Sequence, residues 1–239
     1  MTPDAVRSRR RPPSAAPVAY HLDELAIALD PTRPGHLLPE VRPHHRRVLD
    51  VGCGAGQTLV GCGLHRPEAS AEAWGVDLDT AAIAVGRPRW PRLRLLTARG
   101  ESLPFPDASF DLVLSRVALP YMDIPAALGE FARVLRPGGE LWLALHPARL
   151  VVRQLAAAAR AGAWRSMAYQ LYVLANGAAF HLTGVTRPFP LAARGTESWQ
   201  SRRGMRTALR RAGLTDVVTT RHDGTLAMTA RRPRAADGG

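Results

Sequence analysis

Three glycines at alternate positions follow a short apolar segment near the start of the chain. The sequence "VLDVGCGAGQT" (48–58) places Gly52, Gly54 and Gly56 directly after the apolar residues. Glycine adopts positive φ and permits close approach of the backbone, so the cluster favours a turn that meets a ligand. The apolar residues predict a buried strand, and "QTLVGCGL" predicts the start of a helix. Open α/β sheets bind nucleotide-like ligands at such a strand–turn–helix unit.

Two acidic residues stand where they could bind the same ligand. Asp50 immediately precedes the glycine turn, where a carboxylate can accept hydrogen bonds from backbone amides or from a ligand ammonium. Asp77 ends a second predicted strand, where a carboxylate can accept both hydroxyls of a ribose. The alternative role for Asp77 is to cap the helix predicted for "TAAIAVG" (80–86), but Asp79 is better placed for that cap. The sequence therefore predicts a ribose contact for Asp77.

Four segments in a fixed order resemble one enzyme family. They are "VLDVGCGAGQT", "GVDLD", "ESLPFPDASFDLVLS" and "ARVLRPGGELWLA". Together they resemble the class I S-adenosylmethionine-dependent methyltransferases, of the small-molecule type represented by the ubiquinone and menaquinone methyltransferases. The resemblance covers residues 45–146 and continues more loosely through the final hairpin. It implies S-adenosylmethionine as the cofactor and a seven-stranded sheet whose last strand is antiparallel.

The resemblance also implies which residues bind the cofactor. The glycine turn would meet its amino-acid end, and the acid after the second strand would hold its ribose. The full set of expected cofactor-binding residues is Asp50, Gly52, Cys53, Gly54, Gly56, Asp77, Leu78, Gly100, Glu101 and Arg116.

One position departs from the family pattern. Where the family usually has an acid that accepts from the adenine amino group, "ARGESLPF" has Arg99. A guanidinium has no acceptor. We therefore expect Arg99 to stack on the adenine, donate to a ring nitrogen or face solvent, with Glu101 contributing to the site.

Methyl transfer from a sulfonium needs an aligned nucleophile and only sometimes a base. Alignment and desolvation can supply up to about 7–11 kcal/mol of the barrier reduction, so a dedicated base is not required. The candidates on the acceptor side are Tyr121, which follows the fourth strand, His146 at the end of the fifth, and His181 in the insertion beyond it. The alternative for each is a packing or hydrogen-bonding role.

The elements that position these residues alternate between strand and helix. Apolar spacing predicts a helix over 21–29, and Asp123 is expected to cap a helix with Leu128, Phe131 and Leu135 on one face, ended by "RPGG" (136–139). The predicted strands cover 46–51, 71–77, 92–98, 110–115 and 140–146, followed by 215–221 and 225–231. Asp223-Gly224 predicts a hairpin between the last two. The fold class is therefore α/β: a Rossmann-like, doubly wound sheet of seven strands.

The chain divides into a tail and one domain. Residues 1–17 are rich in Pro and Arg and predict a disordered basic arm, and 18–239 form the methyltransferase domain. Within it, 147–195 form a helical, lid-like insertion before the final hairpin. Its segment 166–184 carries no formal charge. We predict a helical lid there, and a helix on a membrane surface or a membrane span are the alternatives.

Charge and composition limit the partners. The formal net charge is +12, and every one of the 32 basic residues is Arg. Arg202, Arg203, Arg206 and Arg210 lie on one face of a predicted helix, which forms either a solvated surface or a surface that tracks phosphates. The Asp/Asn-Pro-Pro-Tyr motif of many nucleic-acid methyltransferases is missing.

The predicted function is methyl transfer from S-adenosylmethionine to a small, apolar acceptor. The alternatives are an RNA methyltransferase and a catalytically silent cofactor-binding or interaction protein. The two cysteines indicate reduced thiols in a cytoplasmic protein, and no metal is expected.

Overall fold

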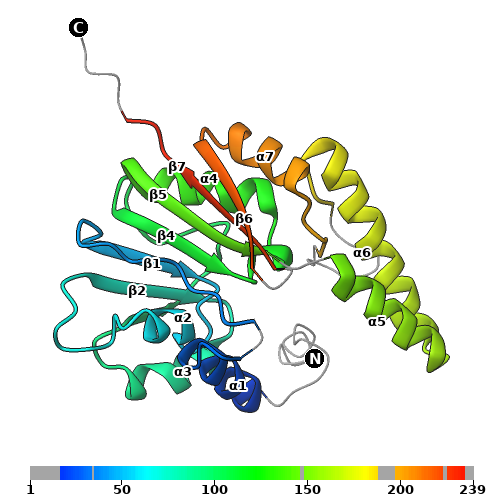
Figure 1. The fold of residues 1–239 in the computed structure, drawn as a ribbon, viewed down its shortest axis with the longest axis horizontal. Helices are drawn as coiled ribbons and strands as arrows, with labels where there is room; N and C mark the ends of the chain where they lie inside the picture. Colours follow the sequence, from blue (N-terminus) through cyan, green and yellow to red (C-terminus); the bar gives the residue numbers. More distant parts are fainter. Residues whose placement is uncertain (1–16, 34, 146–147, 188–196, 223–224, 235–239) are drawn as a thin grey trace, which may run out of the picture.

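A computed structural model describes residues 17–33, 35–145, 148–187, 197–222 and 225–234 (Figure 1). The elements in chain order are α1 (Pro17–Leu29), β1 (Arg47–Val51), α2 (Gln57–Gly61), β2 (Glu72–Asp77), α3 (Thr80–Arg89), β3 (Arg94–Thr97), β4 (Phe110–Arg116), the 3₁₀ turn η2 (Leu119–Tyr121), α4 (Ile124–Val134), β5 (Leu135–Leu145), α5 (Ala148–Arg160), α6 (Trp164–Thr183), α7 (Arg202–Arg211), β6 (Thr215–His222) and β7 (Thr225–Arg231).

The strands form one seven-stranded sheet in the order β3-β2-β1-β4-β5-β7-β6. Strands β1 to β5 pair in parallel, and β7 runs antiparallel to both β5 and β6. The order reverses between β1 and β4, which is the switch point where open α/β sheets bind ligands beyond the carboxyl ends of the strands. The predicted α/β fold class, with seven strands and an antiparallel last strand, is confirmed.

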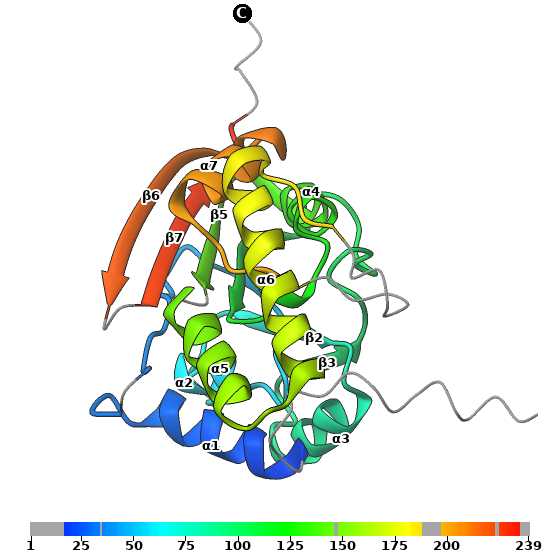
Figure 2. The same ribbon diagram turned by 90° about the vertical axis from the view of Figure 1, so that its right-hand side faces the viewer.

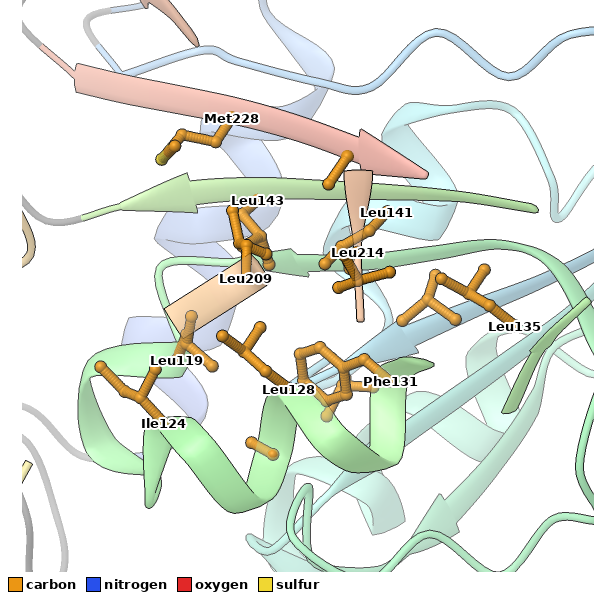
Figure 3. Close-up of a cluster of buried hydrophobic side chains, with 14 of the residues drawn as sticks. Leu119, Ile124, Leu128, Phe131, Leu135, Leu141, Leu143, Leu209, Leu214 and Met228 are labelled. Atoms are coloured by element: carbon orange, nitrogen blue, oxygen red, sulfur yellow. The ribbon is translucent and has the colours of Figure 1, made fainter. Parts of the chain in front are cut away.

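Alternating side chains bury both faces of the sheet. In β5, Leu141, Leu143 and Leu145 enter one cluster with helix α4, and Trp142 and Ala144 enter a second cluster on the other face. Figure 3 shows the first cluster, in which the side chains of Leu128 and Phe131 on α4 point toward the sheet and Leu209 of α7 lies among them. This two-sided burial holds the carboxyl ends of the strands in fixed positions.

The chain from α4 to β5 differs from the expectation. Leu135 was expected on the helix face with Leu128 and Phe131, with a strand only from residue 140. In the structure α4 ends at Val134, and β5 begins at Leu135, which pairs with Phe110 across a bulge in the β4–β5 ladder. Leu135 is buried, so its apolar character reports burial in a strand just as well as burial on a helix.

The ends of the domain follow the predictions with small shifts. Helix α1 begins at Pro17, four residues before the predicted start, so Pro17 belongs to this helix and not to the arm. Residues 1–16 of the predicted arm lie outside the described residues, as do the hairpin turn at 223–224 and His146. The predicted hairpin strands are present as β6 and β7.

The insertion after β5 contains two helices that pack against each other. In Figure 1, β1 and β4 point toward the side of the molecule where α5 and α6 lie, and in Figure 2 these helices stand in front of the sheet. Helix α6 covers almost all of the uncharged segment 166–184. Within the described part of the chain, no helix is long and apolar enough to cross a membrane.

Candidate cofactor site

The glycine turn connects β1 to α2 through three residues with positive φ. Gly52, Gly54 and Gly56 have φ values of 79°, 55° and 94°. Side-chain-bearing residues rarely adopt such angles, so the local backbone itself requires glycine. The amides of Gly52 and Cys53 both donate to the carbonyl of Val76 in β2, at 2.8 and 3.0 Å. These bonds fix the turn against the neighbouring strand.

Close packing is a second reason for two of these glycines. A Cβ at Gly52 would lie 2.1 Å from the Cβ of Ala118, and a Cβ at Gly54 would lie 2.6 Å from Gln57 Oε1. Ala118 is held there by the end of β4, where Val117 has a φ of 50°, a strained angle for a β-branched residue. The nearest obstacles are therefore protein atoms, and the turn is shaped before any ligand arrives.

The carboxylate of Asp77 ties the glycine turn to β2. Its Oδ2 accepts from the Gly54 amide at 2.7 Å, and its Oδ1 accepts from the Asp79 amide at 2.8 Å. Burial raises the pKa of Asp77, although these two amide bonds oppose the shift. Each carboxylate oxygen has a further lone pair, so Asp77 can hold the turn and still accept ribose hydroxyls.

The predicted cap of the next helix is confirmed. Asp79 is the N-cap of α3, and its Oδ1 accepts from the amides of Ala81 and Ala82 at 2.9 and 3.4 Å. Asp77 is therefore not needed as the cap of this helix.

Asp50 is a fully buried carboxyl group without an ion-pair partner among the described residues. The side chain has no exposed surface, and neither carboxylate oxygen has a hydrogen bond of ordinary geometry there, although the Thr58 side chain interacts with it. Burial raises the pKa of Asp50 to about 8, against the opposing effects of the Arg116 charge and the Thr58 side chain. A buried carboxylate in this state is stabilised by a cation, because an unpaired charge is costly to bury.

Arg116 connects the end of β4 to helix α1. Its Nη1 and Nη2 donate to Glu24 Oε2 at 2.7 and 2.6 Å, and its buried Nε has no partner. Nearer the start of α1, the His21 ring lies 3.0 Å from Gln57 Nε2 and 3.8 Å from Asp79 Oδ2. Helix α1 thus lies beside the glycine turn and contacts residues from three other parts of the site. Neither Glu24 nor His21 belongs to a sequence motif, so no pattern in the sequence predicts their place at the site.

Of the remaining predicted cofactor residues, Leu78 is exposed, whereas Gly100 and Cys53 are buried. Leu78 is 49% exposed directly after Asp77, so it offers an apolar surface at the carboxyl end of β2. Gly100 is buried, and a Cβ there would lie 2.6 Å from Met122 Sδ. Cys53 is buried against Gly75 of β2, and burial raises the pKa of its thiol. The Cys53 side chain therefore packs in the sheet as a neutral thiol.

Arg99 pairs with Glu101 at the edge of the site. Arg99 Nη2 donates to Glu101 Oε1 at 3.3 Å, and the same oxygen accepts from the Asp123 amide at 3.1 Å. Arg99 is half exposed, whereas Glu101 is mostly covered. The roles of Arg99 and Glu101 toward the adenine stay predictions.

The acceptor side contains a pair of residues that sequence analysis missed. The hydroxyl of Tyr169 in α6 donates to Glu197 in the segment before α7. Burial raises the pKa of Glu197, opposed by that hydrogen bond. Burial and the bond to Glu197 raise the pKa of Tyr169, and Tyr121 adds a smaller effect in the same direction. Tyr121 thus lies near a carboxyl–phenol pair that joins the insertion to α7.

His181 contacts the start of α7. Its Nδ1 lies 2.9 Å from the hydroxyl of Ser201, the N-cap of α7, and its ring lies near Trp199. These contacts join α6 to α7. They match the packing alternative for His181, and a contact with an acceptor stays a prediction.

One group of potential metal ligands lies elsewhere, at His44, His45 and Glu140. The Nδ1 of His45 accepts from the Arg42 amide at 3.0 Å, so its Nε2 carries the proton and cannot bind a metal. Arg42 and Arg231 donate to Glu140 at 3.2 and 2.6 Å. Two arginines thus already balance the Glu140 charge, and this group is an ion-pair network.

Comparisons with known proteins show what the chain is similar to. A family model described as "Methyltransferase domain" matches residues 49–143. Malonyl-[acyl-carrier protein] O-methyltransferase of Halorhodospira halophila is 43% identical over 111 residues, which cover 45% of this chain and 37% of that protein. Phthiotriol/phenolphthiotriol dimycocerosates methyltransferase of Mycobacterium leprae is 38% identical over 112 residues, covering 44% of this chain and 40% of that protein.

A solved structure extends the likeness of the fold. A SAM-dependent methyltransferase of Thermotoga maritima has a TM-score of 0.53, with 18% identity over 90% of each chain. Residues 49–143 thus match a methyltransferase domain, and the fold around them is that of a SAM-dependent methyltransferase structure. The chain spans about two fifths of the length of the curated relatives named above.

Proposed function

We propose that the protein transfers a methyl group from S-adenosylmethionine to a small, apolar acceptor. The observation that carries this proposal is Asp50, a fully buried carboxyl group beside a glycine turn that forms no ion pair within the described part of the chain. S-adenosylmethionine presents a cation to such a group, because its amino-acid end carries an ammonium. The neighbouring Arg116 can pair with the carboxylate of the same end.

The other residues of the site fit the rest of the cofactor. Asp77 has lone pairs left for the ribose hydroxyls, and the exposed Leu78 offers an apolar surface to one face of the adenine. Glu101 is the acceptor available to the adenine amino group once its pairing with Arg99 is released. The cofactor supplies the electrophilic methyl, while the chain binds it and orients it toward the insertion.

The acceptor would lie between the end of β4 and helix α6. Tyr121 and the Tyr169–Glu197 pair are the polar groups on that side. Glu197 would take a proton where the acceptor loses one, since its raised pKa makes it a stronger base than an ordinary carboxylate. Helices α5 and α6 would form the lid over this space. The relatives named above act on an acyl-carrier-protein-bound malonyl group and on a phthiotriol lipid by their names, and both are consistent with an acceptor that has an apolar part.

A tritiated-methyl assay tests this function against its rivals. The protein is incubated with labelled S-adenosylmethionine and either a lipid extract or total RNA, with Asp50→Asn as the matched control. The proposal requires label in the lipid fraction that the control loses. Label in RNA would favour the nucleic-acid alternative. Cofactor binding without transfer to either fraction would favour the catalytically silent alternative.

A further inference from the structure

Helix α6 carries an apolar stripe on an exposed face. The residues at spacings of four and three along this helix are all apolar and all exposed: Trp164, Ala168, Leu171, Ala175, Ala178 and Leu182. This spacing keeps them on one side of the helix over its whole length. Trp164, Leu171 and Leu182 are 69%, 54% and 68% exposed. Large apolar side chains exposed in a row indicate a surface that binds something.

The opposite face of α6 already anchors the helix to the domain. Val173 and Phe180 are completely buried, and Asn176 donates to the backbone carbonyls of Arg187 and Glu197 at 3.1 and 2.9 Å. At Gly177 a Cβ would lie 2.1 Å from the Trp199 ring. The exposed stripe therefore contributes nothing to the core.

Helix α5 also exposes apolar residues. Its residues Val152, Ala156 and Ala159 are exposed with the same spacing. The two helices pack side by side on the outside of the molecule, as both views show (Figures 1 and 2), and a short connection with Gly162 at a φ of 62° joins them. We call this pair of helices, residues 148–183, the α5–α6 hairpin.

The charge of the hairpin is entirely positive. Residues 148–187 contain no Asp or Glu, and their basic residues are Arg149, Arg153, Arg160, Arg165 and Arg187. At the tip, Arg160 and Arg165 flank Trp164, and the Arg165 guanidinium lies 5.2 Å from the centroid of the Trp164 ring. A second copy of the chain on this face would bring arginines against arginines. An anionic partner without side-chain specificity fits both the apolar stripe and the charge.

We propose that the outer face of the α5–α6 hairpin rests on an anionic lipid bilayer. Helix α6 lies parallel to the bilayer with its stripe among the acyl chains, Trp164 sits at the level of the headgroups, and the flanking arginines contact lipid phosphates. This is the chemistry of amphipathic helices that bind in the plane of a membrane. The proposal goes beyond methyl transfer and does not depend on it.

Vesicle flotation tests the proposal directly with the full chain and no cofactor. The protein is mixed with vesicles of phosphatidylcholine alone, or of an equal mixture of phosphatidylcholine and phosphatidylglycerol. We expect flotation with the anionic vesicles only, and its loss when salt rises from about 0.1 M to about 1 M, since surface charge is then screened. Equal binding to both vesicle types, or no binding to either, would overturn the proposal.

Matched variants distinguish binding through this surface from nonspecific adsorption to the vesicles. Leu171→Glu places a charge in the stripe and should reduce partitioning by about tenfold or more. Val218→Glu changes an equally exposed apolar residue on β6 and should leave partitioning unchanged. Trp164→Ala should weaken partitioning and remove quenching of tryptophan fluorescence by brominated lipid. Unchanged partitioning in both hairpin variants would overturn the proposal, as would a dimer in solution that Leu171→Glu converts to monomer.

Discussion

Cofactor affinity should depend on pH through Asp50. The carboxyl is fully buried, no described basic residue pairs with it, and burial raises its pKa to about 8 despite the opposing effects of Arg116 and Thr58. If the ionised carboxylate pairs with the cofactor ammonium, the proton on Asp50 must leave when S-adenosylmethionine binds. Below the pKa of the free protein, each pH unit then changes the dissociation constant tenfold, or about 1.4 kcal/mol. The cofactor ammonium stays protonated up to about pH 7, the ordinary range for an α-amino group.

Isothermal titration calorimetry measures both consequences. Between about pH 5.5 and about pH 7 the dissociation constant should fall roughly 30-fold, and binding should release close to one proton, seen by comparing buffers of different ionisation enthalpy. Asp50→Asn, which has nearly the same shape, should bind about 1.5–3 kcal/mol more weakly at pH 7 and lose the pH dependence. An affinity independent of pH over this range, with native circular dichroism, would refute the role of Asp50.

Four further predictions follow from the same geometry. Asp50→Asn should stabilise the cofactor-free protein above about pH 4 and raise its melting temperature at pH 7.5. The reason is that the folded-state pKa lies above the unfolded value of 3.8, so the wild type loses stability as pH rises toward 8; thermal melts from pH 4 to 8 that overlay for both proteins would contradict this. Asp77→Ala should weaken cofactor binding by about 2–4 kcal/mol, whereas Asp79→Ala, which removes the α3 cap and the contact with His21 but no predicted cofactor contact, should cost about 0.5–2 kcal/mol of stability with a smaller loss of affinity; equal affinities for Asp77→Ala and wild type in calorimetry would remove Asp77 from the site. Arg99→Asp should leave affinity unchanged or tighten it by up to about 1.5 kcal/mol, because it restores an acceptor for the adenine amino group; a tenfold loss with an intact fold would show a specific Arg99 contact. Hydrogen exchange in residues 166–184 should slow when cofactor and acceptor are both bound, as expected of a lid, and unchanged exchange there would argue against one.

The parts of the fold that the sequence predicted are those with strong local signals. The glycine turn after β1, the Asp79 cap and the β6–β7 hairpin each depend on neighbouring residues, and the structure contains all three. Leu135 was placed wrongly, because an apolar residue after a helix fits burial on the helix and burial in the next strand equally well. Only the pairing of Leu135 with Phe110 decides between them.

Glu24 and Glu197, which no sequence motif indicates, are brought to the site by tertiary contacts. Glu24 reaches Arg116 from 92 positions away, and Glu197 meets Tyr169 across 28 positions. No motif spacing connects such pairs, so they become visible only when the sheet and the insertion are assembled. The burial of Asp50 without an ion pair among the described residues is likewise a property of the folded interior. The sequence predicts Asp50 at the glycine turn, but it does not show that the carboxyl is buried there.

The glycine turn, Asp50 and Asp77 should together hold S-adenosylmethionine with its methyl directed toward α6. A crystal structure with S-adenosylhomocysteine would show whether they do. We expect the ammonium at Asp50, the ribose hydroxyls at Asp77, the adenine over Leu78 and the sulfur facing the space between Tyr121 and the Tyr169–Glu197 pair. A cofactor bound with its amino-acid end away from Asp50, or with its sulfur turned away from α6, would disprove this arrangement.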